Sequence, residues 1–131
     1  MICIEQQRDV AGLLEWASVR LDNPLASAVD VRLAGVAARL AFEFHLAELC
    51  RQHGPPKGIR WHSYAIRLLK CGVFTMDDYK AARRISRLAH KAVHGKPFDR
   101  TRAGMLYAAV SEFVSEKVEV DEVEFSAPSK G

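Results

Sequence analysis

The feature that most constrains the fold is a long segment, residues 23–52, that has helical spacing and apolar residues around most of its circumference. Asn23-Pro24 is typical of a helix cap followed by a proline at the first helical position, and Gly-Pro-Pro at 54–56 ends the segment. Alanines occupy many other positions, so neighbouring helices can pack closely. The apolar stripe is Leu25, Val29, Leu33, Val36, Leu40, Phe44, Ala47 and Cys50. We expect one long central helix.

Three shorter segments also have helical patterns. Residues 5–21 carry apolar side chains at i, i+3, i+4 and i+7, and residues 59–71 form a short pattern that Gly72 closes. Thr75 opens the next segment with a signal close to a capping box, followed by acids that suit the positive end of the helix dipole. This segment runs to His94 and stops at the following glycine.

The last helical segment begins at Asp99 or Thr101 and reaches about Val118. Its inward stripe is Met105, Ala109, Phe113 and Val114. Residues 119–131 alternate like a strand for part of their length but have no partner strand, and residues 118–124 hold four acids and no base. We therefore expect an all-α fold, a bundle of four to five helices forming one domain over residues 1–118, with a flexible acidic tail at 119–131.

Composition and cysteine use favour a cytoplasmic globular protein. Apolar residues make up 49% and charged residues 27% of the chain, and no apolar run approaches the length of a membrane helix. The N-terminus lacks the layout of a signal peptide. Cys3, Cys50 and Cys71 are odd in number and far apart, so we expect reduced, buried thiols. We also expect Trp16 and Trp61 to be core anchors.

Several enzyme classes lack their motifs in this chain. It has no nucleophile elbow, no phosphate-binding glycine loop and no pair of catalytic carboxylates. None of the five histidines belongs to an HExxH or another metal pattern, and His45, in an apolar segment, fits a buried position. We therefore expect neither a metal nor a cofactor.

The candidate site is a basic helix end that reads RRISRLAHKAVHG, residues 83–95. On a helix, Arg83, Arg87, His90 and His94 share one face, opposite an apolar stripe of Ala81, Ile85, Leu88 and Ala92. Arginine offers a planar fork to phosphate oxygens, and histidine gives or takes protons near neutral pH. This set of groups could act on a phosphodiester.

Further cations extend the same surface. Arg83, Arg84, Lys91 and Lys96 are the candidate nucleic-acid contacts, since the chain becomes clearly basic once its acidic end is set aside. His94 lies in the last helical turn, where the negative end of the dipole favours a cation. The competing interpretation is that these residues form an ordinary solvated face, because basic residues commonly occupy exposed last turns.

The segment YKAARRISRLAHKAVHG resembles the HEPN superfamily (higher eukaryotes and prokaryotes nucleotide-binding), in which a helix typically ends in an arginine, a polar residue and a following histidine, often as RNKAVHG. The similarity in layout covers about residues 20–117. It implies a helical bundle that dimerises, and in active members a metal-independent ribonuclease that acts as a toxin or in defence against phage, with an antitoxin or another protein as a possible partner. The Arg and His pair then lies in a cleft at the dimer interface.

The resemblance assigns roles to particular residues. His94 matches the motif histidine as the acid/base group, and Arg87, with six residues between the two, matches the wide form of the spacing as the phosphate binder. An ungapped alignment instead puts the usual arginine at Ala89 and the polar residue at His90, which would serve as a second imidazole. Glu43 on the central helix is a candidate to orient an arginine.

Three functional hypotheses remain open at this stage. The first is a toxin-like or defence-associated ribonuclease that uses Arg87, His90 and His94. The second is a catalytically degenerate dimeric module that binds RNA, a nucleotide or a protein partner, as Ala89 suggests. The third is a helical scaffold whose basic face is only solvated. A homodimer also follows from the long helix, because a bundle of this size need not cover apolar residues on every side of it.

Overall fold

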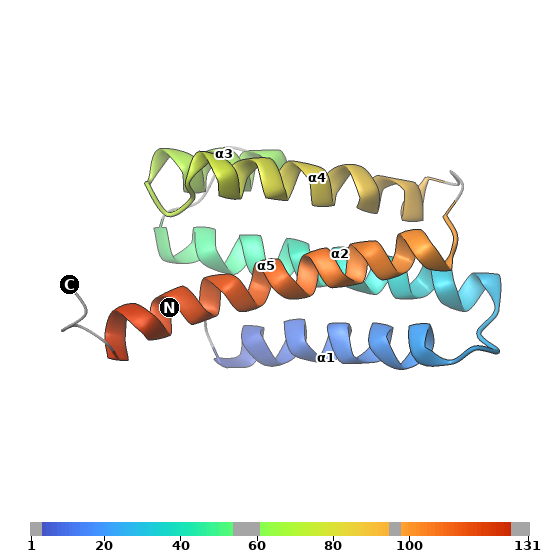
Figure 1. Ribbon diagram of the computed structural model, residues 1–131. Coiled ribbons are helices and arrows are strands. Elements are labelled where there is room, and N and C mark those ends of the chain that lie inside the picture. The colour runs from blue at the N-terminus through green and yellow to red at the C-terminus, as the bar shows by residue number, and fades with distance from the viewer. Residues whose placement is uncertain (1–3, 54–60, 95–97, 127–131) are drawn as a thin grey trace.

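The computed structural model describes residues 4–53, 61–94 and 98–126, which form five α-helices and no strand (Figure 1). In chain order they are α1 (Ile4–Asp22), α2 (Ala28–His53), α3 (Trp61–Lys70), α4 (Met76–Val93) and α5 (Arg100–Ser126). The prediction of an all-α helical bundle is confirmed.

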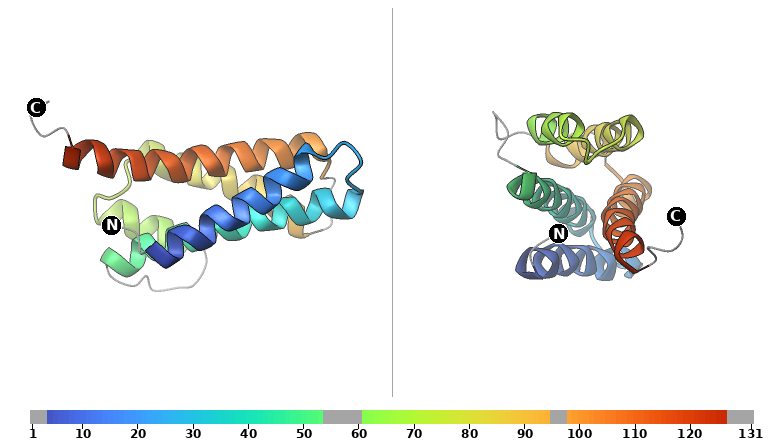
Figure 2. Two further views of the ribbon diagram at one scale, coloured as in Figure 1. Left: turned by 90° about the horizontal axis from the view of Figure 1, so that it is seen from below. Right: turned by 90° about the vertical axis from the view of Figure 1, so that its left-hand side faces the viewer.

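The long helix α2 is central, as its sequence predicts. It contacts α1, α3, α4 and α5, and the end-on view in Figure 2 shows α3 and α4 on one side of it and α1 on the other, with α5 alongside. Phe113 of α5 joins the layers, because its ring meets Phe42 edge-on at 5.7 Å and Phe74 at 5.6 Å between centroids. Full burial of each such side chain stabilises the fold by about 1.5–3 kcal/mol.

The start of α2 differs from the sequence prediction. Asn23-Pro24 does not begin the helix; instead the Asn23 side chain accepts a hydrogen bond from the Leu25 amide at 2.9 Å and closes a turn. Ser27 is the cap: its hydroxyl accepts from the Asp30 amide at 3.1 Å, and the Asp30 carboxylate accepts from the Ser27 amide at 3.4 Å. This reciprocal pair satisfies two end groups at once, which explains the later start.

The inward face of α2 is built mainly from small residues, whereas its long apolar stripe lies largely outside. Val29 is 66% exposed, Leu33 45%, and Leu40 and Phe44 38% each. The buried face comprises Val31, Ala34, Gly35, Ala37, Ala38, Ala41, Phe42, His45, Leu46, Glu48, Leu49 and Cys50. The described chain therefore leaves part of the stripe uncovered, as the distribution of apolar residues around this helix suggests.

At Gly35, Phe98 and the end of α4 come close to the backbone of α2. A Cβ atom at this position would collide with the ring of Phe98 and lie 3.2 Å from the Cβ of Ala92, near the end of α4. Phe98 is 9% exposed and Ala92 1%. The absence of a side chain at Gly35 thus allows the end of α4 and the start of the last segment to pack on α2.

The turn between α3 and α4 follows its sequence signals. Gly72 has φ +80°, a left-handed conformation, and the Val73 amide donates to the Leu68 carbonyl at 3.0 Å. Thr75 then caps α4: its hydroxyl accepts from the Asp78 amide at 3.1 Å while the Asp78 carboxylate accepts from the Thr75 amide at 2.9 Å. The predicted glycine stop and the predicted cap are both confirmed.

Helix α5 begins where predicted and ends later than predicted. Asp99 caps it, accepting from the Arg102 amide at 2.9 Å. The expected end near Val118 and the strand-like alternative are wrong for residues 119–126, which are helical to Ser126. No glycine or proline interrupts these residues, and adding a residue to an existing helix costs far less than starting one. The rest of the expected tail, 127–131, lies outside the described residues.

Two core predictions are also corrected, and a third is not tested. Trp16 is not a core anchor: its side chain is 38% exposed, and the Arg20 guanidinium stacks 3.8 Å from its ring centroid. Met105 does not point inward but is 57% exposed. The burial of Trp61 lies outside what the structure describes.

Of the cysteines, Cys50 is a buried free thiol as predicted, whereas Cys71 is exposed. Cys71 follows the last turn of α3, at the open end of that helix, so the core does not cover it. Burial, with a smaller contribution from the neighbouring Cys71, raises the pKa of Cys50 to about 11. Cys3 lies outside the described residues.

His45 is buried at 1% exposure, as predicted. None of the described helices has the length and apolar character to span a bilayer.

Candidate functional site

The two sides of α4 have different chemistry, as the sequence predicts. Toward the core it presents Ile85 and Ala92 of the predicted apolar stripe, together with Ala82 and Ala89, each 0–3% exposed. The other two predicted stripe residues, Ala81 and Leu88, are only half-buried. The opposite surface carries the exposed cations and imidazoles Arg83, Arg84, Arg87, His90, Lys91 and His94. The capping box at Thr75 and the helical spacing of the alanines fix this orientation, so the basic residues are held on a rigid helix.

His90 and His94 form a stacked pair at the end of α4. Their ring centroids lie 4.1 Å apart with 28° between the planes, and the His94 amide donates to the His90 carbonyl at 3.1 Å. Both side chains are exposed. Two adjacent imidazoles can supply one group that accepts a proton and another that donates one, so the pair has the components of acid/base chemistry.

Arg32, which the sequence analysis did not single out, holds this end of α4 in place. From α2 its Nη1 donates to the carbonyls of Lys91 at 3.0 Å and Ala92 at 2.8 Å. These are among the last carbonyls of the helix, which have no partner within the helix itself. A lone arginine in the apolar start of α2 was the available signal, but nothing in the sequence ties it to a segment 59 residues later.

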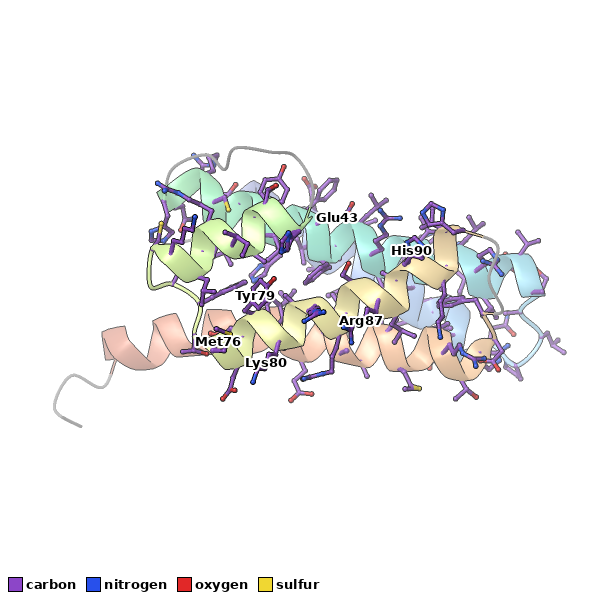
Figure 3. The ribbon with its side chains drawn as sticks, turned by 90° about the horizontal axis from the view of Figure 1, so that it is seen from above. Glu43, Met76, Tyr79, Lys80, Arg87 and His90 are labelled. Carbon is purple, nitrogen blue, oxygen red and sulfur yellow. The ribbon has the colours of Figure 1, made fainter. Side chains whose placement is uncertain are left out.

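Arg87 lies beside the imidazole pair along the helix but lines a groove that neither histidine lines. It lines a groove of about 520 Å³ between α4 and α5, together with Arg84 and Lys91. Figure 3 shows His90 near the end of α4 and Arg87 one turn earlier on the same helix. The structure therefore places three of the predicted cations in one groove. The two histidines lie outside this groove, at the C-terminal end of α4.

The burial of Ala89 bears on which arginine could serve the site. At 2% exposure, Ala89 lies against the core, so an arginine at this position would bury its guanidinium. Arg87 is exposed. Of the two alignments, the wide spacing, Arg87 with His94, is therefore the one that puts its arginine and the terminal histidine on the same exposed side of this helix.

Two further predicted residues have defined surroundings. Glu43 does orient an arginine, but on its own helix: Arg39 Nε donates to the Glu43 carboxylate at 3.0 Å. Arg83 is exposed on α4 and does not line the groove. Lys96 lies outside the described residues.

The start of α4 is held against α3. The Tyr79 hydroxyl lies 2.9 Å from His62 Nε2 of α3, and this contact anchors that end of the basic helix.

Within residues 4–53, 61–94 and 98–126, no group of three or more His, Cys, Asp or Glu side chains is arranged to hold a metal ion. Comparison with known proteins yields no match to a family model, to a curated protein or to a solved structure. The interpretation of the site therefore depends on its own geometry: a stacked histidine pair at the end of an exposed basic helix, with an arginine-lined groove beside it.

Proposed function

We propose that this protein is a HEPN-like RNA-binding or RNA-cleaving protein whose site is the exposed side of α4. The observation that carries the proposal is the stacked His90–His94 pair, 4.1 Å between ring centroids, beside the groove that contains Arg87. Imidazoles for proton transfer next to a guanidinium for phosphate binding are the groups that transesterification of RNA requires without a metal.

In the proposed reaction an RNA 2′-hydroxyl attacks the adjacent phosphorus. One imidazole of the pair takes the hydroxyl proton, and the other returns a proton to the departing 5′ oxygen. The products are a 2′,3′-cyclic phosphate and a new 5′-hydroxyl, so no oxidant or cofactor is consumed. Arg87 stabilises the charge that builds on the phosphate oxygens. His94, in the role the resemblance gives it, is the acid/base group and His90 the second imidazole.

The test is RNA cleavage in EDTA by the purified full chain. We expect cleavage that His94→Ala lowers by roughly 10²- to 10⁴-fold, with the melting temperature unchanged because the side chain is exposed. Lys70→Ala, which removes an exposed cation from α3, is the matched control and should cleave at the original rate. Cleavage that persists in His94→Ala at the same rate would exclude this residue from the chemistry.

A second candidate is a catalytically degenerate binding or assembly module. It is favoured by one observation: Arg87 lines the groove between α4 and α5, and neither histidine does. Such a module would bind RNA, and Arg84→Ala would weaken the binding, but no cleavage would occur in EDTA or with added metal. The cleavage assay thus separates the two candidates.

We further propose that two copies associate through the uncovered face of α1 and α2, which does not include α4 and so differs from the interface around Arg87 and His94 that the resemblance implies. Trp16, Leu33, Leu40 and Phe44 line a groove of about 570 Å³ there, and each is 38–45% exposed. Apolar surfaces of this kind commonly mark protein interfaces. Light scattering should give twice the chain mass for the original protein and one chain mass for Leu40→Asp; a monomeric original protein at micromolar concentration would exclude the dimer.

The biological setting is proposed by the same resemblance. A toxin or defence-associated ribonuclease would act in the cytoplasm, and the exposed free thiol of Cys71 is suited to a reducing compartment. An antitoxin or other protein partner would block the basic surface until RNA cleavage is required. Expression in bacteria tests this setting: growth arrest that His94→Ala relieves supports it, and normal growth with abundant folded protein contradicts it.

A further inference from the structure

The groove between α4 and α5 has the dimensions and composition of a small-ligand site. Its volume of about 520 Å³ falls within the range of roughly 300–1,000 Å³ that is usual for such sites. One wall is cationic, formed by Arg84, Arg87 and Lys91 of α4. The opposite wall belongs to α5 and includes Met105 and Glu112.

The spacing on the two helices explains why the groove is continuous. The α4 residues Arg84, Arg87 and Lys91 lie at i, i+3 and i+7, so they share one face. Met105 and Glu112 on α5 are likewise seven residues apart. Because α4 and α5 follow one another and run in opposite directions (Figure 1), Lys91 lies toward the Met105 end and Arg84 toward the Glu112 end.

The floor of the groove is apolar. Leu88 of α4 and Ala109 of α5 are half-buried, and Phe113 beneath them is 5% exposed. Met105 stands at the rim with 57% of its side chain exposed, although the sequence pattern predicts an inward position. A flat apolar group could therefore lie along this floor.

The charges of the walls define the polar parts of the ligand. Within the described part of the chain, neither Arg84 nor Arg87 has an acidic partner within 4.0 Å, so both guanidinium groups can bind an anion. Glu112 on the other wall would repel a second anion but can accept a hydrogen bond from an amino group. The complementary ligand has a phosphate, a flat ring and an amino substituent on that ring.

We propose that this groove binds one nucleotide of an RNA strand, with its phosphate toward Arg87 and Lys91 and its base toward Glu112. Glu112 then selects bases that present an exocyclic amino group, such as cytosine, over uracil, which presents a carbonyl oxygen at the same position. Lys91, at one end of the groove, lies directly after His90 and one turn before His94 on the same helix. This assignment deepens the proposed RNA function and rests on it only for the identity of the polymer.

Binding of single nucleotides tests the groove without requiring cleavage. The chain has three methionines, and those at 76 and 105 are both exposed on described helices, so methyl-labelled methionine provides a reporter at the groove and one outside it. On titration of the full chain with cytidine monophosphate we expect the Met105 methyl signal to shift and the Met76 signal to stay. Uridine monophosphate should bind roughly five- to tenfold more weakly.

Three variants separate the contributions. Lys91→Ala should lower the affinity for both nucleotides roughly tenfold, because it removes a charged partner of the phosphate. Glu112→Gln should abolish the preference for cytidine, since an amide can donate as well as accept. Lys70→Ala, outside the groove, should leave both affinities unchanged.

The outcomes distinguish this assignment from the proposed function. Nucleotide binding with these variant effects supports the groove even if no RNA is cleaved. RNA cleavage that depends on His94, together with no Met105 shift at millimolar nucleotide, overturns the groove assignment and leaves the proposed function standing. Equal affinity for the two nucleotides, or tighter binding of an oligoglutamate peptide, also overturns it.

Discussion

The side of α4 that faces the core and the side that faces solvent differ in both size and charge. The inner side carries Ala82, Ile85, Ala89 and Ala92, each 0–3% exposed, and it approaches α2 closely enough that Gly35 has no room for a Cβ atom. The outer side carries arginines, lysine and the histidine pair. One helix thus separates residues that stabilise the fold from residues available to a ligand.

Because the two sides of α4 are separate, we expect that residues on one side can be substituted without changing the property that depends on the other side. Changes on the inner side should alter the free energy of unfolding, because the space there is already filled. Changes on the outer side should alter binding and cleavage while leaving stability within about 0.5 kcal/mol. The predictions below test that separation in order of expected effect on stability.

The largest expected effect comes from Ala89→Arg. This change puts an arginine in the position that the ungapped HEPN-like alignment would give it, but Ala89 is 2% exposed. A buried guanidinium without a partner should destabilise the protein by about 3–5 kcal/mol. Chemical denaturation followed by circular dichroism measures this loss.

Arg87→Ala is the control for that experiment, because Arg87 lies two residues away on the exposed side. It should leave the denaturation midpoint nearly unchanged. A stable Ala89→Arg variant with greater RNA cleavage would contradict the separation of the two sides, and it would favour the ungapped alignment over the Arg87–His94 spacing.

A smaller loss is expected from Gly35→Ala. The new methyl group would collide with the Phe98 ring, and displacing this buried ring should cost about 1–3 kcal/mol. Gly104→Ala on α5 is matched chemically but meets no atom within 4 Å, so it should stabilise the helix by about 0.5–1 kcal/mol. Thermal unfolding of both variants should show shifts of opposite sign. Two shifts of the same sign would mean that the Gly35 contact does not limit packing.

Arg32→Ala should have an intermediate effect at the junction of the two sides. It removes the donors that satisfy the carbonyls of Lys91 and Ala92, at a cost of about 1–2 kcal/mol. Hydrogen exchange should become faster in the last turn of α4 and stay unchanged at its capped start near Thr75. Arg32→Lys, which keeps the charge, should recover part of the protection. Unchanged exchange in both variants would show that solvent satisfies these carbonyls equally well.

Much of the fold follows from the sequence because its signals are local. The Thr75 cap, the Gly72 stop and the helical spacing of α4 depend only on nearby residues, and the structure has each of them. The stop of α5 was missed because residues 119–126 suit a helix once one exists, although their alternation also suits a strand. Local spacing cannot distinguish these outcomes.

The site is harder to predict because it depends on contacts between distant segments. The orientation of His90 and His94 follows from their spacing on one helix, whereas the bond from Arg32 to the end of α4 joins residues 59 and 60 positions apart. The Met105 rim of the groove was also missed, since an apolar residue at a helical position usually points inward. Only the packing of α5 on α4 decides its exposure.

The smallest effect on stability is expected from Arg83→Ala. Arg83 is exposed and lies outside the groove, so the free energy of unfolding should stay within about 0.5 kcal/mol of the original. If Arg83 contacts a phosphate of bound RNA, its loss should reduce the slope of log affinity against log salt by about 0.7, the value for one contact to a single strand. Fluorescence anisotropy with a short RNA over a range of salt concentrations measures this slope. Lys70→Ala removes the same charge from another helix and should keep the original slope; equal losses in both variants would mean that net charge, and not the outer side of α4, attracts the RNA.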